Sequence, residues 1–115
     1  MAEPSIDRAA FAELQDTAGA GFVNELVGTF LEEAPAMLDE LRSALAACDG
    51  ERYRRAAHSL KSNGNTFGAS TLGAMARALE VNGLAAEPAA DAAALDALAQ
   101  EYARAAAALK ALRDG

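Results

Sequence analysis

Several residue types are scarce in this sequence of 115 residues. It has no tryptophan, two tyrosines and three prolines, and β-branched residues are also few. Strands favour β-branched and aromatic residues, whereas alanine, which dominates this composition, favours helices. The sequence therefore predicts an all-α protein. A chain of this length normally forms one domain with its own hydrophobic core, so we expect residues 1–115 to fold as a single domain.

Cysteine occurs once, at position 48. One cysteine excludes an intramolecular disulfide and any site built from several cysteines, which suits a reducing compartment. We expect Cys48 to be a small buried apolar residue. The first residues lack the basic flank and apolar core of a secretory signal, and no apolar run approaches the roughly 20 residues that a membrane helix needs. We therefore expect a cytoplasmic protein.

Basic residues are outnumbered: 10 Lys and Arg stand against 17 Asp and Glu, giving a formal net charge of −7. This charge opposes long-range attraction to nucleic acids or anionic lipids, so neither is an expected partner. The sequence also lacks a phosphate-binding glycine loop, a Ser/His/Asp set and a cluster of metal ligands. We therefore expect neither an autonomous enzyme nor a metal site or cofactor in the chain.

A short opening helix is predicted for residues about 7–16. Asp7 can cap this helix, because its carboxylate can accept hydrogen bonds from the free N–H groups of the first turn. Phe11 and Leu14 supply a small apolar face. The glycine-containing segment 17–21 should end the helix.

A long second helix is predicted to extend to about Ala47, since apolar residues recur there at alternating spacings of three and four. Pro35 lies within it and should kink the helix without breaking it, because the apolar periodicity continues beyond it. The segment CDGE, residues 48–51, predicts a tight connection to the next helix. The expected buried positions of the second helix are Val23, Val27, Phe30, Ala34, Met37, Leu41, Ala44 and Cys48, with Leu26, Leu31, Leu38 and Leu45 widening the stripe.

The third helix contains the only histidine. His58 should lie on the side opposite the apolar face, together with Arg54, Lys61, Ser62 and Asn65, because residues three and four apart are neighbours on a helix surface. We therefore expect His58 to face solvent. The apolar face of this helix comprises Tyr53, Ala56, Ala57, Leu60, Gly64 and Phe67.

Two further helices follow. Gly68 suits a left-handed residue that closes the third helix, and Ser70 or a neighbour can begin the fourth. Residues 82–91 mark a turn, and the last helix should extend from about Pro88 to Leu112. Four amphipathic helices with short loops predict an antiparallel up-and-down four-helix bundle, with the opening helix covering one end. The apolar positions of these two helices are Leu72, Met75, Ala76, Leu79, Leu95, Leu98, Tyr102, Ala105 or Ala106, Leu109 and Leu112, with Gly83 as a further candidate.

A lone exposed histidine on a helix is most often a solvated polar residue. Here, however, Arg52, Arg54, Arg55 and Lys61 gather around His58 in an otherwise acidic protein, which indicates a site for a small anion.

The next turn of the same helix contains two small residues, Ser62 and Gly64. Glycine in a helix interior costs up to about 1 kcal/mol relative to alanine. Gly64 therefore indicates either close approach of a partner or tight packing against a neighbouring helix.

The segment AAHSLKSNGNTFGA, residues 56–69, resembles the signature of histidine-containing phosphotransfer (HPt) domains. That signature is H-x-L-K-[G/S]-x-[S/A/G], followed by a glycine ten residues after the histidine. The segment FVNELVGTFLEEAPAMLDEL is similar to the family's second helix and IDRAAFAEL to its opening helix, so the resemblance covers essentially the whole chain. The matching signature residues are His58, Leu60, Lys61, Ser62 and Gly68.

The resemblance implies a role in a two-component phosphorelay. His58 would be the phosphoacceptor, whose imidazole receives a phosphoryl group from an aspartate of one response-regulator receiver domain and passes it reversibly to another. Lys61 would neutralise the phosphoryl oxygens, and Ser62, where many relatives have glycine, would leave room for the approach. Glu80 on the next helix would hold the ring nitrogen that is not phosphorylated. Lys61 and Glu80 are also consistent with ordinary solvated helix residues.

The implied partners are receiver domains, with a hybrid histidine kinase as a further candidate. The Mg²⁺ used in transfer would lie on the receiver. Arg54, Arg55, Asn65 and Arg77 are candidates for docking the acidic rim of a receiver, although each is equally consistent with a solvated side chain. We expect a monomer and, from the opening Met and the length, a stand-alone protein. The alternative function is a helical adaptor that docks signalling partners without chemistry.

Overall fold

The computed structural model describes residues 5–84 and 88–114, and within these residues all regular secondary structure is helical. The predicted all-α class is therefore confirmed. The helices, in chain order, are α1 (Arg8–Ala18), α2 (Ala20–Ala46), α3 (Gly50–Thr66), α4 (Ser70–Asn82) and α5 (Pro88–Asp114).

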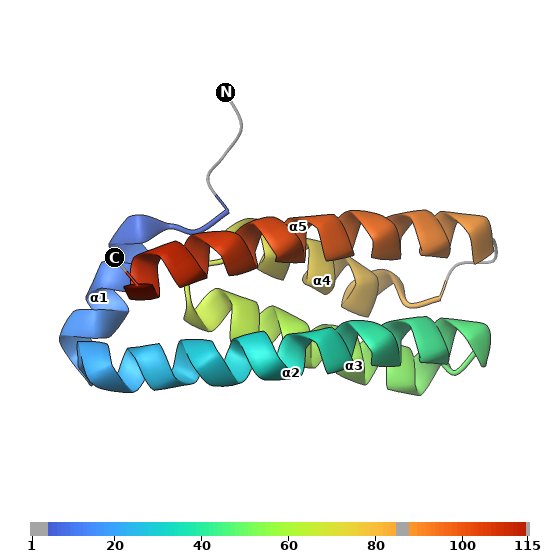
Figure 1. Ribbon diagram of the computed structural model, residues 1–115. Coiled ribbons are helices and arrows are strands. Elements are labelled where there is room, and N and C mark those ends of the chain that lie inside the picture. Colours follow the sequence, from blue (N-terminus) through green and yellow to red (C-terminus); the bar gives the residue numbers. More distant parts are fainter. Residues whose placement is uncertain (1–4, 85–87, 115) are drawn as a thin grey trace, which may run out of the picture.

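The last four helices form a bundle whose long members, α2 and α5, extend along its whole length (Figure 1). Each of the four helices packs against two others, in the cyclic order α2, α3, α4, α5. The short α1 lies across one end of the bundle and contacts α2 (Figure 1). This arrangement confirms the predicted up-and-down four-helix bundle with an additional N-terminal helix. The part of the predicted 82–91 turn at residues 85–87 lies outside the described residues.

The core consists of the apolar faces predicted from the helical periodicity. Phe30 of α2 joins three parts of the core, because its ring centroid lies 5.4 Å from that of Phe67 at the end of α3 and 5.9 Å from that of Tyr102 on α5. Met37 and Tyr102 are partly buried against the core. The predicted residues that are fully or nearly fully buried include Val23, Val27, Ala34, Leu41, Ala44, Tyr53, Leu60, Leu72, Leu95, Leu98 and Leu109.

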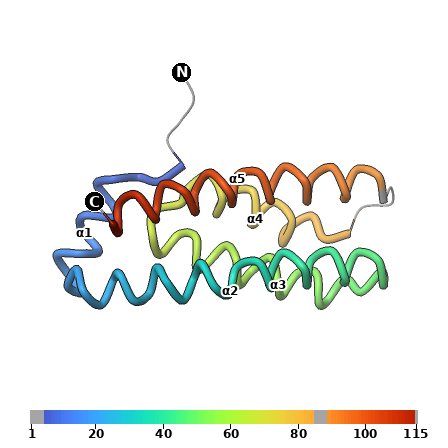
Figure 2. Tube along the Cα trace, viewed as in Figure 1, coloured from blue at the N-terminus to red at the C-terminus, as the bar shows by residue number. Residues whose placement is uncertain are grey.

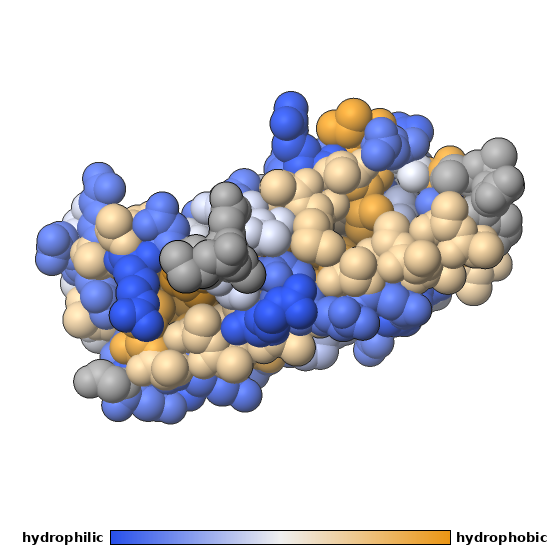
Figure 3. Space-filling view, turned by 90° about the horizontal axis from the view of Figure 1, so that it is seen from above, coloured by the Kyte–Doolittle hydropathy of each residue, from blue (hydrophilic) through white to orange (hydrophobic). Residues whose placement is uncertain are grey.

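The exterior of α5 is weakly hydrophobic in the view from above (Figure 3). This follows from its composition, because most exposed positions on α5 are alanines, among them Ala93, Ala97 and Ala107. The same helix buries two carboxylates, Asp91 and Glu101, and Glu101 accepts a hydrogen bond from the Arg104 guanidinium at 3.0 Å.

The prediction that Cys48 is buried is wrong. The residue is exposed and lies in the turn after α2, with a positive φ of 54°. The apolar periodicity of α2 ends with the helix at Ala46, so the spacing that placed Cys48 on the buried stripe does not apply to a residue outside the helix. Pro35 lies on the exposed side of α2, and the helix continues through it as one element (Figure 2).

The turn between α3 and α4 is held by Gly68 and by Asp7, the residue that precedes α1. Gly68 has a φ of 79°, a left-handed conformation that favours glycine. Its carbonyl accepts a hydrogen bond from the Asp7 N–H at 2.8 Å, and a Cβ at this position would lie 2.9 Å from the Asp7 carbonyl oxygen. Asp7 also caps α1 as predicted, because its Oδ1 accepts from the Ala10 N–H at 3.1 Å.

We expect Gly68→Ala to lower the free energy of unfolding by about 1–3 kcal/mol, because alanine disfavours the left-handed φ and would collide with Asp7. Urea denaturation followed by circular dichroism measures this loss. Gly28→Ala is the matched control: a Cβ at Gly28 meets no atom within 4 Å, so alanine in this helix should stabilise by up to about 1 kcal/mol. Equal effects of the two substitutions would contradict the requirement for glycine at position 68.

Candidate functional site

The candidate site lies on the outer face of α3 and on the neighbouring helix α4. Tyr53, Ala57 and Leu60 of α3 are fully buried, and this fixes which side of the helix faces outward. His58 is exposed on that side, as predicted. The helix begins at Asp49, whose Oδ1 caps it by accepting from the Arg52 N–H at 3.1 Å.

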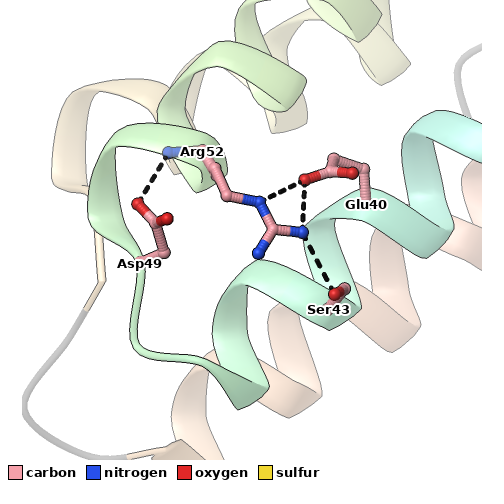
Figure 4. Close-up of polar contacts among 4 residues, drawn as sticks. All are labelled: Glu40, Ser43, Asp49 and Arg52. Carbon is pink, nitrogen blue, oxygen red and sulfur yellow. Dashed lines mark hydrogen bonds and ion pairs between the residues drawn. The ribbon is translucent and has the colours of Figure 1, made fainter.

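The beginning of α3 is fastened to α2 through Arg52 (Figure 4). The Nε and Nη2 atoms of Arg52 both lie 2.6 Å from Glu40 Oε1, and Nη2 also donates to Ser43 Oγ at 3.1 Å. The hydrogen bond with Glu40 raises the pKa of the guanidinium. Arg52 is therefore occupied in an interhelical contact and is not part of the positive cluster that the sequence indicated around His58.

One carboxylate of α4 binds two side chains of α3. Glu80 Oε2 lies 2.7 Å from His58 Nδ1, and Glu80 Oε1 accepts a hydrogen bond from Lys61 Nζ at 2.7 Å. The His58 side chain is 58% exposed, compared with 24% for Glu80 and 23% for Lys61. The structure therefore brings together three residues that the sequence analysis proposed, in a contact between α3 and α4.

This geometry determines which imidazole nitrogen is free. The hydrogen bonds from Lys61 and, to a smaller extent, from His58 lower the pKa of Glu80, so the carboxylate is ionised near neutral pH and can only accept. In a neutral His58 the nitrogen facing Glu80, Nδ1, must then carry the proton. The lone pair is left on Nε2, the ring nitrogen that does not face Glu80.

The glycines beside this site serve the packing of α3 against α4. Gly64 is buried, and a Cβ there would be in ordinary contact with Leu72 and with backbone atoms of Ala69 and Gly73. Gly64 therefore faces the neighbouring helix α4 and not solvent, and the ordinary contacts of a Cβ show that alanine would also fit there. The Asn65 side chain lies against Gly73, where any Cβ would collide with it.

Comparison with known families matches residues 25–108 to the Hpt domain. The chain belongs to the Hpt domain family. Members of this family carry phosphoryl groups in phosphorelays, so this protein is a phosphotransfer intermediate. The structure is also similar to the crystal structure of histidine-containing phosphotransfer protein B from Pseudomonas aeruginosa PAO1, with a TM-score of 0.83 and 24% sequence identity, over 98% of this chain and 97% of that one. This likeness concerns the fold. No curated protein sequence matches the chain significantly.

The other predicted site residues of this Hpt domain surround His58 on different sides. Ser62 is exposed one turn after it. Arg54 lies beside Gly83 at the end of α4. Arg55 lines a groove between α2 and α3, whereas Arg77 lies one turn before Glu80 on the exposed side of α4. The three arginines therefore border the site without forming one cluster.

The groove beside Arg55 was not predicted from the sequence. It has a volume of about 590 Å³. Met37 contributes to it from α2, although the sequence indicated only a core position for this residue, and Ser59 lies next to His58 in the chain. Only the packing of α2 on α3 brings these residues together. The remaining lining residues are Glu33, Ala36, Glu40, Arg52 and Ala56.

Among the residues that the structure describes, no group of three or more His, Cys, Asp and Glu side chains is arranged to hold a metal ion. In the same part of the chain, no helix is both long and apolar enough to cross a membrane.

We expect Glu80 to titrate below its ordinary pKa of 4.5 and to move toward that value in Lys61→Ala, because Lys61 is the largest cause of the lowered pKa. Carbon-13 NMR of the Glu80 carboxyl measures both titrations. Because the pKa is lower in the folded state, the contact stabilises the fold above the pKa of the unfolded chain, and this contribution is lost as the pH falls through the folded pKa. An unchanged Glu80 pKa in Lys61→Ala would contradict the contact between Lys61 and Glu80.

Proposed function

We propose that this Hpt domain accepts a phosphoryl group on His58 from an aspartate of one response-regulator receiver domain and passes it to another. The observation that carries this proposal is the contact of Nδ1 with Glu80, which leaves the lone pair on Nε2 of an exposed side chain. A nucleophile that another protein phosphorylates needs a free lone pair and an exposed side chain, and His58 has both.

The transfer is a displacement at phosphorus. The Nε2 lone pair forms the N–P bond while the P–O bond to the receiver aspartate breaks, and the aspartate leaves as a carboxylate. The Lys61 ammonium supplies positive charge for the phosphoryl oxygens, and Mg²⁺ would be held by the receiver. The reaction is reversible, so the same site serves either direction of phosphoryl flow. Phosphate would come from partner proteins, because the sequence contains no glycine loop of the kind that binds the phosphates of ATP.

The docking surface would surround His58. Arg54, Arg55 and Arg77 border the site and complement the acidic rim expected of a receiver, and Asn65 lies at the far end of the same face. Ser62, one turn after His58, leaves space beside the ring. A hybrid histidine kinase that carries a receiver domain is a further candidate partner. We place this exchange in the cytoplasm and expect the Hpt domain to act as a monomer.

His58→Gln should abolish acid-labile, base-stable phosphate on the protein, because the chain contains no other histidine. The test incubates the variant and the unsubstituted protein with phosphorylated receiver domains and measures label on each. Circular dichroism should show an unchanged fold, since His58 is exposed. Acid-labile phosphate retained on the variant would contradict the proposal. Absence of label on the folded, unsubstituted protein from every receiver would favour the adaptor function.

Lys61→Ala should slow transfer from a receiver about tenfold, the loss expected for one charge-assisted hydrogen bond at a partly exposed site. Rapid-quench measurement of phosphohistidine formation gives this rate. The thermal midpoint of unfolding should change little, because an ion pair at the surface that solvent still reaches contributes little to stability. A large fall in that midpoint, with an unchanged transfer rate, would indicate a structural role for Lys61.

A further inference from the structure

Lys61 has two competing anionic partners if His58 is phosphorylated. In the structure its ammonium is bound to Glu80 Oε1, while the other oxygen of the same carboxylate holds His58 Nδ1, both at 2.7 Å. The Nδ1–H bond and the Nε2 lone pair point away from each other across the ring, so a group on Nε2 is directed away from Glu80. After phosphorylation the Lys61 ammonium would therefore have two anions on different sides of the ring, the Glu80 carboxylate that it binds in the structure and the phosphoryl group.

The charges of the cluster change during transfer. Before it, Glu80 is a monoanion, Lys61 is a cation and a neutral His58 carries its proton on Nδ1. When Nε2 bonds to phosphorus and the receiver aspartate departs as a carboxylate, the ring keeps the Nδ1 proton and becomes an imidazolium. The attached phosphoryl group carries about two negative charges near neutral pH. The ring thus becomes a cation already in contact with Glu80, beside a new dianion.

We propose that Glu80 exchanges one cation for another during transfer: Lys61 leaves it for the phosphoryl oxygens, and the phosphorylated imidazolium of His58 takes its place. This inference rests on the proposed function of His58. A dianion attracts an ammonium more strongly than a monoanion does at the same distance, which draws Lys61 toward the phosphoryl group. At the same time, the carboxylate keeps a cationic partner. Glu80 acts on the reaction through His58 and Lys61, so it is a positioning residue.

The exchange matches a carrier that works in both directions. When the phosphoryl group leaves, the ring becomes neutral again and Lys61 returns to Glu80. Neither the carboxylate nor the ammonium is left without a counter-charge in either state. In the resting state the contact with Glu80 also keeps the ammonium away from Nε2, so the nucleophile stays accessible to the incoming phosphorus.

NMR can follow Lys61 directly, because the chain contains only two lysines, Lys61 and Lys110. The protein is labelled with nitrogen-15 lysine and phosphorylated with phosphoramidate, a small phosphodonor that needs no receiver. We expect the Lys61 ammonium signal to shift on phosphorylation and to gain a coupling to phosphorus-31 across the new hydrogen bond. The exposed Lys110 is the internal control and should not change.

A double-mutant cycle tests whether the lysine and the carboxylate are coupled through the exchange. Glu80→Gln keeps an oxygen for the Nδ1 proton but removes the charge that holds Lys61. With Lys61 present, its ammonium is no longer held by residue 80 and can bind the phosphoryl oxygens, which offsets part of the effect of losing the carboxylate charge. We expect Glu80→Gln to lower the equilibrium constant for phosphohistidine formation from a phosphorylated receiver about threefold or less, but about tenfold in the Lys61→Ala background.

The matched control is Asp96→Asn, which removes one carboxylate charge and an exposed ion pair with Arg42 between α5 and α2. It should leave the equilibrium constant unchanged. Equal effects of Glu80→Gln in the two backgrounds would overturn the exchange, as would a phosphorylated protein in which the Lys61 signal stays in its resting position. Absence of phosphohistidine with both phosphoramidate and receivers would instead overturn the proposed function itself.

Discussion

The packing of α3 against α4 is the constraint on which the site depends. His58 and Lys61 come from one helix and Glu80 from the other, so their contacts exist only while the two helices keep their register. Small residues lie along this contact. Gly64 and Gly73 lie where the helices meet, and Gly68 closes the turn that joins them. The contacts among His58, Lys61 and Glu80 therefore depend on residues between the two helices that make no contact with these side chains' polar groups.

The rest of the bundle holds this pair of helices in place. Arg52 fastens the beginning of α3 to α2 through Glu40 (Figure 4). At the other end, the Asp7 N–H binds the Gly68 carbonyl and ties the start of α1 to the α3–α4 turn. α3 is therefore anchored near both of its ends, while its middle presents His58 to solvent. Such an arrangement suits an accessible nucleophile that must keep a defined orientation.

Most of the fold was predictable from the sequence because helical periodicity is a local signal. The buried stripe of α2, the outward position of His58 and the cap at Asp7 follow from spacing and residue type, and the structure has all three. The error at Cys48 arose where the stripe was extended past the end of a helix. The resemblance to a known family also indicated Glu80, which no spacing within α3 could have identified.

Contacts between helices were beyond this kind of prediction. The attachment of Arg52 to Glu40, the placement of Asn65 against Gly73 and the groove containing Met37 each depend on how two helices are rotated toward one another. Apolar patterns do not specify these rotations for polar side chains. The buried Glu101 shows the same limit, since alanines on both sides of α5 weaken the pattern that separates its faces.

The contact between Glu80 and His58 also has a stereochemical consequence. Phosphohistidine exists as two isomers, which differ in the ring nitrogen that bears the phosphorus and in their chemical lifetimes. Glu80 binds the proton on Nδ1, so if His58 is the phosphoacceptor that we propose, only the isomer with phosphorus on Nε2 is open to it. Under the proposed function, one carboxylate on a neighbouring helix thus selects which ring nitrogen is modified without itself touching the phosphoryl group.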